Sequence, residues 1–126
     1  RSAKGRLAEI IVLDQFSRNM FRDDAKAFAA DELAVELAKE ALPYWGEFSI
    51  QERSFVVMPF MHSESLAVHD WAVKWFDEPG LERRKKYELL HREIIERFGR
   101  YPHRNRVLGR TSTPEEEAFL KEHSGF

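Results

Sequence analysis

The chain has no cysteine and no apolar run approaching the roughly 20 residues that a membrane-spanning helix needs. Without cysteine there are neither disulfides nor thiolate zinc sites, a composition compatible with the reducing cytoplasm, where we expect the protein to reside. The opening segment RSAKGR lacks the apolar stretch of a signal peptide. These absences predict a soluble protein with no membrane partner.

An excess of charge of one sign is also missing. The 20 Lys and Arg residues face 22 Asp and Glu residues, and the net charge of -2 argues against general nucleic-acid affinity. The chain contains neither a glycine-rich phosphate loop nor a nucleophile elbow, and no segment of useful length alternates apolar and polar residues as a strand does. We therefore predict no cofactor and no sheet.

What the chain does have is a large apolar content, 43% hydrophobic and 13% aromatic over 126 residues. That is enough for one domain with a core rich in rings. The chain begins at Arg1 and enters an apolar helix within a few residues. We expect residues 1–126 to form a single all-α domain that lacks an N-terminal portion of the full-length domain.

Capping signals and apolar spacing predict five or six antiparallel helices. The first, through Phe16, is apolar on nearly every side and should be packed all round. Asp31 is expected to cap a second helix that runs to Leu42. The Ser49–Glu52 capping box opens a third, which Pro59 is expected to interrupt.

A fourth helix is expected over about 64–77, with Trp71 among its inward residues. A fifth ends at Phe98, where Gly99 offers a left-handed stop, and its inner face should include Leu90. A capping box over 113–116 starts a short last helix. Paired as hairpins, these helices predict an all-α, tetratricopeptide-like stack without a sheet.

The segment 91–110 gathers six arginines and two histidines. Arg97 and Arg100 each follow a glutamate by four residues, so ordinary surface ion pairs account for part of their presence. Such pairing leaves their role in a site open.

Arg104 and Arg110 have no such local partner, and they sit on a turn with His103 and Asn105 between them. That set suits bidentate capture of a carboxylate or phosphate. The rival interpretation makes the arginines clamps that tie the turn to buried Asp14 and Glu64 and to helix C-terminal carbonyls. Both remain open for Arg104, whereas Arg106 is expected to face solvent.

Asp14 lies on the inner stripe of the first helix, so an ionised carboxylate there needs strong partners. Arg18, four residues on, is the nearest candidate. In a functional interpretation Asp14, Arg18 and Asn19 form one polar wall at the helix end. In a structural one Asp14 is only a buried ion-pair member.

His62 and Glu64 flank a turn between helices, and His91 falls on the inner face of the fifth helix. They suit general acid and base work. His-x-Glu is not a strong ligand spacing, so no metal site is predicted, and a hydrogen-bonded structural network is the plain alternative. Tyr101 and Phe98 within the basic segment also permit stacking of a nucleobase, which the acidic pI disfavours.

Three stretches carry a family resemblance: LDQFSRN at 13–19, MPFMHSE at 58–64 and HREIIERFGRYPHRNRVLGRTSTPEE at 91–116. With the KAFAADELA segment they resemble the bacterial family known as domain of unknown function 924 over almost the whole chain. The resemblance implies an all-α, tetratricopeptide-like fold and a further aromatic-rich N-terminal segment. Ser17 departs from the proline usual in the family. The resemblance locates a site and names no substrate, and we expect the three motifs to converge in space.

Three functions follow from these patterns. The leading one is a binding module that holds a small anionic ligand or an acidic peptide in a polar cleft. A hydrolase-like alternative assigns His62 or His103 as general base with Glu64 as its partner. The third is purely structural, with a protein partner or a second copy on the face left open by the missing segment. The ligand-binding set of the first is Asp14, Arg18, Asn19, His91, Arg97, Arg100, Arg104, Asn105 and Arg110.

Overall fold

The computed structural model describes residues 3–16, 28 and 30–123, and these residues contain helices and no strand. In chain order they are α1 (Ala3–Ile11), the π-helical turn η1 (Val12–Phe16), α3 (Asp31–Ala41), the 3-10 segment η3 (Leu42–Glu47), α4 (Ile50–His62), α5 (Leu66–Ala72), the 3-10 segment η4 (Val73–Phe76), α6 (Glu82–Phe98), the 3-10 turn η5 (Pro102–Arg104) and α7 (Pro114–Glu122). The predicted all-α class is confirmed for this part of the chain. The tetratricopeptide-like stacking stays a prediction.

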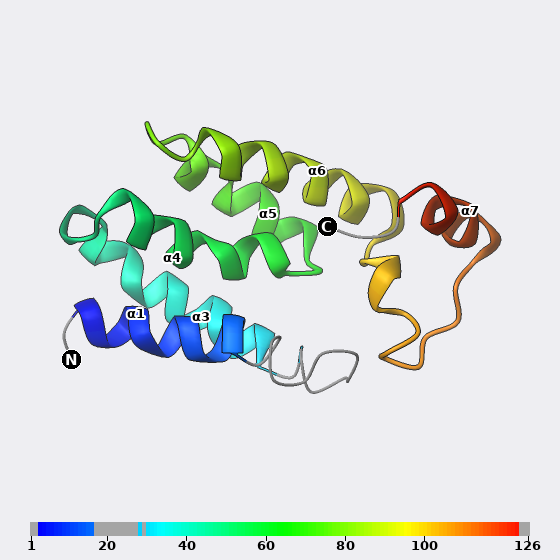
Figure 1. Ribbon diagram of the computed structural model, residues 1–126, viewed down its shortest axis with the longest axis horizontal. Helices are drawn as coiled ribbons and strands as arrows, with labels where there is room; N and C mark the ends of the chain where they lie inside the picture. Colours follow the sequence, from blue (N-terminus) through cyan, green and yellow to red (C-terminus); the bar gives the residue numbers. More distant parts are fainter. Residues whose placement is uncertain (1–2, 17–27, 29, 124–126) are drawn as a thin grey trace.

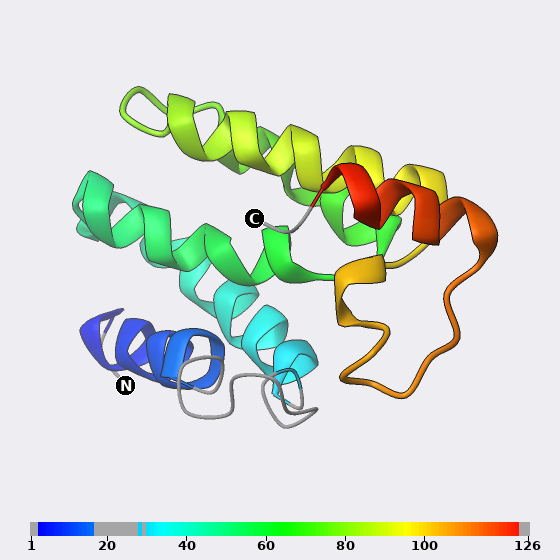
Figure 2. The same ribbon diagram turned by 45° about the vertical axis from the view of Figure 1, so that its right-hand side comes forward.

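The longer helices alternate in direction along the chain, from α1 at one side of the molecule to α6 at the other (Figure 1). The second view shows the loop after η5 swinging out before α7 returns along the end of α6 (Figure 2). The turn that joins α4 to α5 therefore lies close to both the start of α3 and the segment after α6.

Three of the predicted helix-end signals form as expected. Ser49 Oγ accepts a hydrogen bond from the Glu52 N–H at 3.1 Å, and the Glu52 carboxylate accepts one from the Ser49 N–H at 2.9 Å. Thr113 and Glu116 make the same reciprocal pair at the start of α7. Gly99 ends α6 with φ of 74°, which a side chain would disfavour.

Two apolar clusters make the core. The larger joins α1, α3, α4 and the end of η4, and Phe60 and Phe76 are its largest members. The smaller joins the last turns of α6 to α7 through Ile94, Ile95 and Phe119. Tyr101 belongs to the smaller cluster and, as shown below, hydrogen bonds to α4.

Two expectations about helix ends are wrong. Ala30 rather than Asp31 precedes the first turn of α3, because the Ala30 carbonyl already accepts the Ala34 N–H at 2.9 Å. The Asp31 carboxylate contacts Arg104 instead of capping the helix. Pro59 does not interrupt α4, which continues to His62. Proline lacks a backbone N–H, but this removes only one hydrogen bond from a helix whose last turns are buried.

The fourth predicted helix is also wrong in extent. Ser65 caps α5, so the helix starts at Leu66, and after Ala72 it tightens into η4. Trp71, expected inside, is 42% exposed. One edge of its ring packs on Phe60, and the ammonium of Lys39 lies over its face.

In α6 the buried face differs from the expected one. Leu90 is 42% exposed and Glu88 is buried, against expectation, whereas His91 is buried as predicted, beside Ile94 and Ile95. Apolar spacing placed the stripe wrongly because polar residues occupy part of the interior. The first helix is likewise not packed all round, since Val12 is 49% exposed.

Candidate functional site

Three successive carbonyls at the end of α4 are each held by a side chain from elsewhere in the chain. The Tyr101 hydroxyl donates to the Met61 carbonyl at 2.6 Å. Arg104 Nη2 donates to the His62 carbonyl at 2.8 Å, and His69 Nε2 donates to the Ser63 carbonyl at 2.6 Å. Helix-end carbonyls lack intrahelical partners, so these bonds fix the α4–α5 turn.

The His62 ring joins η1 to this turn. Its Nδ1 lies 2.8 Å from Asp14 Oδ1, and the Gln15 amide donates to the other carboxylate oxygen. Asp14 is 1% exposed and belongs to the π-helical turn η1, a distortion that is frequent at functional sites. Asp14 and Arg104 thus both contact His62, and the predicted convergence of the sequence motifs is confirmed. The partner of His62 is Asp14 rather than Glu64.

Arg104 lies beside the α4–α5 turn, and its guanidinium contacts two aromatic rings. The Phe28 centroid is 4.3 Å from its Cζ and the Tyr101 centroid is 4.8 Å away. Nη1 is 3.3 Å from Asp31 Oδ2 and 4.0 Å from Glu64 Oε1. The bond to the His62 carbonyl and the pair with Glu64 are contacts that the clamp interpretation of Arg104 predicted, whereas the pair with Asp31 was not predicted.

Arg110 binds Glu64 through two parallel hydrogen bonds of 3.0 Å. The Tyr101 N–H donates to the same carboxylate at 2.7 Å. Burial raises the pKa of Glu64, but these bonds and the charge of Arg104 outweigh it and hold the pKa below its ordinary value. Arg110 Nε also donates to Asn105 Oδ1 at 2.9 Å.

Arg100 makes a similar pair with Glu116 at the start of α7, through bonds of 2.9 and 2.7 Å. The expected pair with Glu96 does not form, because Glu96 binds Arg92 one turn back. The bonds from Arg100 lower the pKa of Glu116 to about 2, against a smaller opposing effect of burial. Asn105 is buried and its amide donates to Ser112 Oγ at 3.0 Å.

Other predicted site residues lie against α7. The Arg97 guanidinium stacks on Phe98 and Phe119, at 4.7 and 5.7 Å from the ring centroids. His103 meets the edge of Phe119, and its Nε2 donates to the His123 carbonyl at 2.9 Å. Arg106 is exposed, as expected. Arg18 and Asn19 lie outside the described residues.

His91 is buried and neutral. Its Nδ1 donates to the Tyr87 carbonyl at 2.7 Å, and its ring meets the edge of Tyr101 with centroids 5.6 Å apart. Burial lowers the pKa of His91 to about 4, and the charges of His62, His69 and Arg104 add to that effect. The imidazole is therefore a hydrogen-bonding group rather than a cation at neutral pH.

Sequence reasoning missed the buried pair of His69 and Glu88, both of which are 0% exposed. His69 Nδ1 lies 2.9 and 2.8 Å from the two Glu88 oxygens. The available signal was position: each residue occupies the inner face of its helix, where a polar side chain needs a specific partner.

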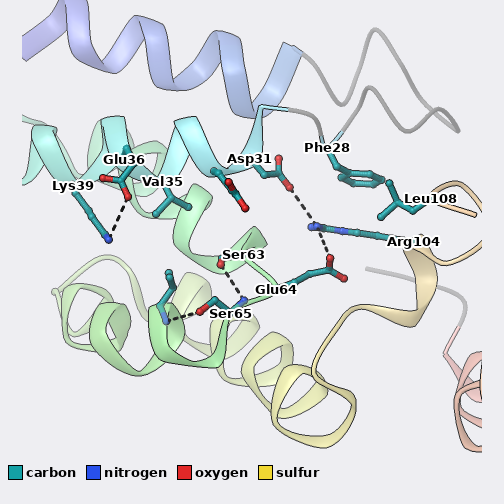
Figure 3. Close-up of a pocket in the computed structure, with 12 residues that line it drawn as sticks. Phe28, Asp31, Val35, Glu36, Lys39, Ser63, Glu64, Ser65, Arg104 and Leu108 are labelled. Atoms are coloured by element: carbon teal, nitrogen blue, oxygen red, sulfur yellow. Dashed lines mark hydrogen bonds and ion pairs between the residues drawn. The ribbon is translucent and has the colours of Figure 1, made fainter. Parts of the chain in front are cut away.

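A cleft of about 630 Å³ opens beside the fixed turn (Figure 3). One wall is the N-terminal half of α3, the other is the segment from Ser63 to Val68, and Arg104 closes one end between Asp31 and Glu64. Its described lining residues are Phe28, Asp31, Glu32, Val35, Glu36, Lys39, Ser63, Glu64, Ser65, Val68, Arg104 and Leu108.

Two further features, a membrane-spanning helix and a metal-binding cluster, are absent from the described residues. No helix among them combines the length and hydropathy that crossing a membrane requires. No three of their His, Asp or Glu side chains are grouped so that they could hold a metal ion.

Comparison with known proteins agrees with the fold. A solved structure of a protein of unknown function from Agrobacterium tumefaciens is 39% identical, with a TM-score of 0.85. The match covers 96% of this chain and 69% of that one. No curated protein matches the chain. Residues 1–124 match the family described as "Bacterial protein of unknown function (DUF924)". The chain therefore belongs to the DUF924 family.

Proposed function

We propose that the protein is a binding module and that the cleft beside the α4–α5 turn holds a small polar ligand or a peptide segment. The observation that carries the proposal is the cleft itself, whose volume of about 630 Å³ falls in the range of ligand sites. Its walls come from segments far apart in the sequence and are held by side-chain bonds to the turn. A site built this way is formed before the ligand arrives, so binding loses little conformational entropy.

The charge of the lining favours a ligand with a positively charged group. Four carboxylates line the cleft, those of Asp31, Glu32, Glu36 and Glu64, against the cations of Lys39 and Arg104. Arg110 compensates the charge of Glu64 from behind, which still leaves one carboxylate in excess.

The arginines that suggested an anion in the sequence act elsewhere. Arg100 and Arg110 bind internal carboxylates, and Arg97 stacks on rings. Of the arginines in the predicted ligand-binding set, Arg104 lines the cleft. We therefore propose the opposite ligand charge to the one the sequence suggested.

A pair of probes with the same carbon chain and opposite charge tests this function. We expect cadaverine, a five-carbon diamine, to shift the NMR amide signals of Val35, Ser65 and Val68, and glutarate, the five-carbon dicarboxylate, to leave them unchanged. Glu32→Gln should weaken cadaverine binding, whereas Glu47→Gln, which removes an exposed charge on η3, should not. Shifts with glutarate alone would favour the anionic ligand, and shifts with neither probe would contradict a charged-ligand cleft.

A catalytic role is the second candidate, and one observation favours it. The buried Asp14 carboxylate holds Nδ1 of His62, an arrangement that orients an imidazole as general base. We expect His62→Gln to abolish any hydrolysis of p-nitrophenyl acetate while keeping the thermal melting temperature. His103→Gln is the control, because His103 lies against α7. Equal rates in the wild type and the His62 variant would exclude this role.

A further inference from the structure

The proposed binding function leaves the buried pair of His69 and Glu88 unused. The pair nonetheless touches the cleft, because His69 Nε2 donates to the carbonyl of Ser63, which lines it. The Tyr101 hydroxyl stands next to the same nitrogen, 3.1 Å from His69 Nε2 and 2.6 Å from the Met61 carbonyl. A pair with no exposed surface thus connects α6 to the cleft wall.

The distances fix how many protons the pair holds. A carbonyl only accepts, so the 2.6 Å contact with Ser63 requires a proton on His69 Nε2. On the other side Nδ1 faces a carboxylate at 2.8 Å, and two lone pairs would repel there, so one more proton lies between them. Burial raises the pKa of Glu88, and the bond and charge of His69 and the charge of Arg92 offset this only in part.

Loss of that shared proton to solvent has a defined consequence. The proton that remains on the ring moves to Nδ1, where it binds the Glu88 carboxylate, and Nε2 becomes an acceptor facing the Ser63 carbonyl. The Tyr101 hydroxyl, already 3.1 Å away, turns from the Met61 carbonyl to Nε2. Two of the three carbonyls that fix the α4–α5 turn then lose their donors.

The surrounding charges come from several elements. Arg92, on α6 with Glu88, acts on the Glu88 carboxylate and is itself drawn outward by Asp70 of α5, at 2.8 Å. His91 of α6 feels the charges of His62, His69 and Arg104 and is neutral near pH 7. On the turn, Glu64 is ionised and bound by Arg110.

We infer that a single proton shared by His69 and Glu88 sets the wall of the binding cleft, so that its loss as the pH rises releases residues 61–65. The link to ligand binding rests on the proposed function of the cleft, whereas the rearrangement of the turn does not.

NMR spectra recorded between about pH 5 and pH 10 follow the turn and the imidazole through the ordinary imidazole range and above it. We expect the amide signals of Ser63 and Ser65 and the ring nitrogens of His69 to change with one common midpoint. In Glu88→Gln the side-chain amide donates to Nδ1 permanently, so that midpoint should vanish. Glu93→Gln, a change at an exposed position of α6, should retain it.

A second variant keeps the test decisive if Glu88→Gln fails to fold. Tyr101→Phe removes the donor that replaces the Ser63 contact, so the common midpoint should move to higher pH. Turn signals that do not follow His69, or a midpoint unchanged in these variants, would overturn the inference.

Cadaverine titrations at either side of the midpoint separate this inference from the function of the cleft. A wild-type affinity that changes across the midpoint, with no change in Glu88→Gln, supports both. A turn that titrates without any cadaverine binding supports the proton-linked wall and contradicts the proposed cation-binding function.

Discussion

Arg110 and Glu64 meet in a two-pronged ion pair, with both guanidinium nitrogens 3.0 Å from the carboxylate oxygens. Glu64 lines the cleft, whereas Arg110 approaches from behind, bound also to Asn105 and to the Tyr101 carbonyl. The pair therefore joins the segment after α6 to the α4–α5 turn. An arginine twelve residues beyond the end of α6 thus holds a carboxylate that lines the cleft.

Replacing that arginine by lysine should destabilise the fold. Arg110→Lys keeps the charge but loses the fork that binds Glu64 and Asn105, so the free energy of unfolding should fall by roughly 2 kcal/mol. Urea denaturation measures it. Arg106→Lys, at an exposed position in the same segment, should change the free energy by less than about 0.5 kcal/mol. Equal effects of the two changes would contradict the role of the pair.

The sequence predicted helix ends better than helix faces. The capping boxes at Ser49 and Thr113 and the stop at Gly99 are local chemistry, and all three form. The inner face of α6 was predicted only in part, because His91 is buried as expected, whereas Glu88 is buried and Leu90 is not. A polar interior residue depends on partners from other helices, which one sequence does not reveal.

The candidate site was predicted in part for the same reason. The motifs around Asp14, His62 and Arg104 converge as expected. The pairing of the side chains could not be predicted, because Glu64 lies two residues from His62 yet pairs with Arg110, 46 residues away.

The burial of neutral His91 should make the stability of the fold depend on pH. The pKa of His91 falls from an ordinary 6.5 to about 4 on folding, so the unfolded chain binds more protons in between and stability declines as pH falls through that range. Between pH 7 and pH 5 the loss should be about 2 kcal/mol. Urea denaturation at both pH values measures it. His91→Phe should reduce the difference by that amount, and an unchanged difference would show that His91 is not neutral in the fold.

The ion pair between Glu116 and Arg100 at the start of α7 should be lost at low pH. The pKa of Glu116 is lowered to about 2 from an ordinary 4.5, so its stabilising effect is present above pH 4.5 and is lost as pH falls towards 2. Carboxyl NMR titration measures the value directly. In Arg100→Ala the pKa should rise towards 4.5, because the bonds from Arg100 are the largest cause of the shift. If the value stays near 2 in that variant, the helix N-terminus rather than Arg100 holds the carboxylate.

The turn after α6 depends on backbone geometry that only glycine adopts easily. Gly99 has φ of 74°, and an added Cβ would meet no atom within 4 Å, so the effect of Gly99→Ala is purely conformational. We expect a loss of roughly 1 kcal/mol in the free energy of unfolding. Gly46→Ala is the matched control, because its Cβ also has open space and its φ is not in the left-handed region. There the lower entropy of the unfolded chain should leave stability unchanged or slightly higher. Thermal melts of the two variants decide the matter: a larger loss in Gly46→Ala than in Gly99→Ala would mean that the left-handed stop does not direct the chain from α6 into the Tyr101–Arg104 segment.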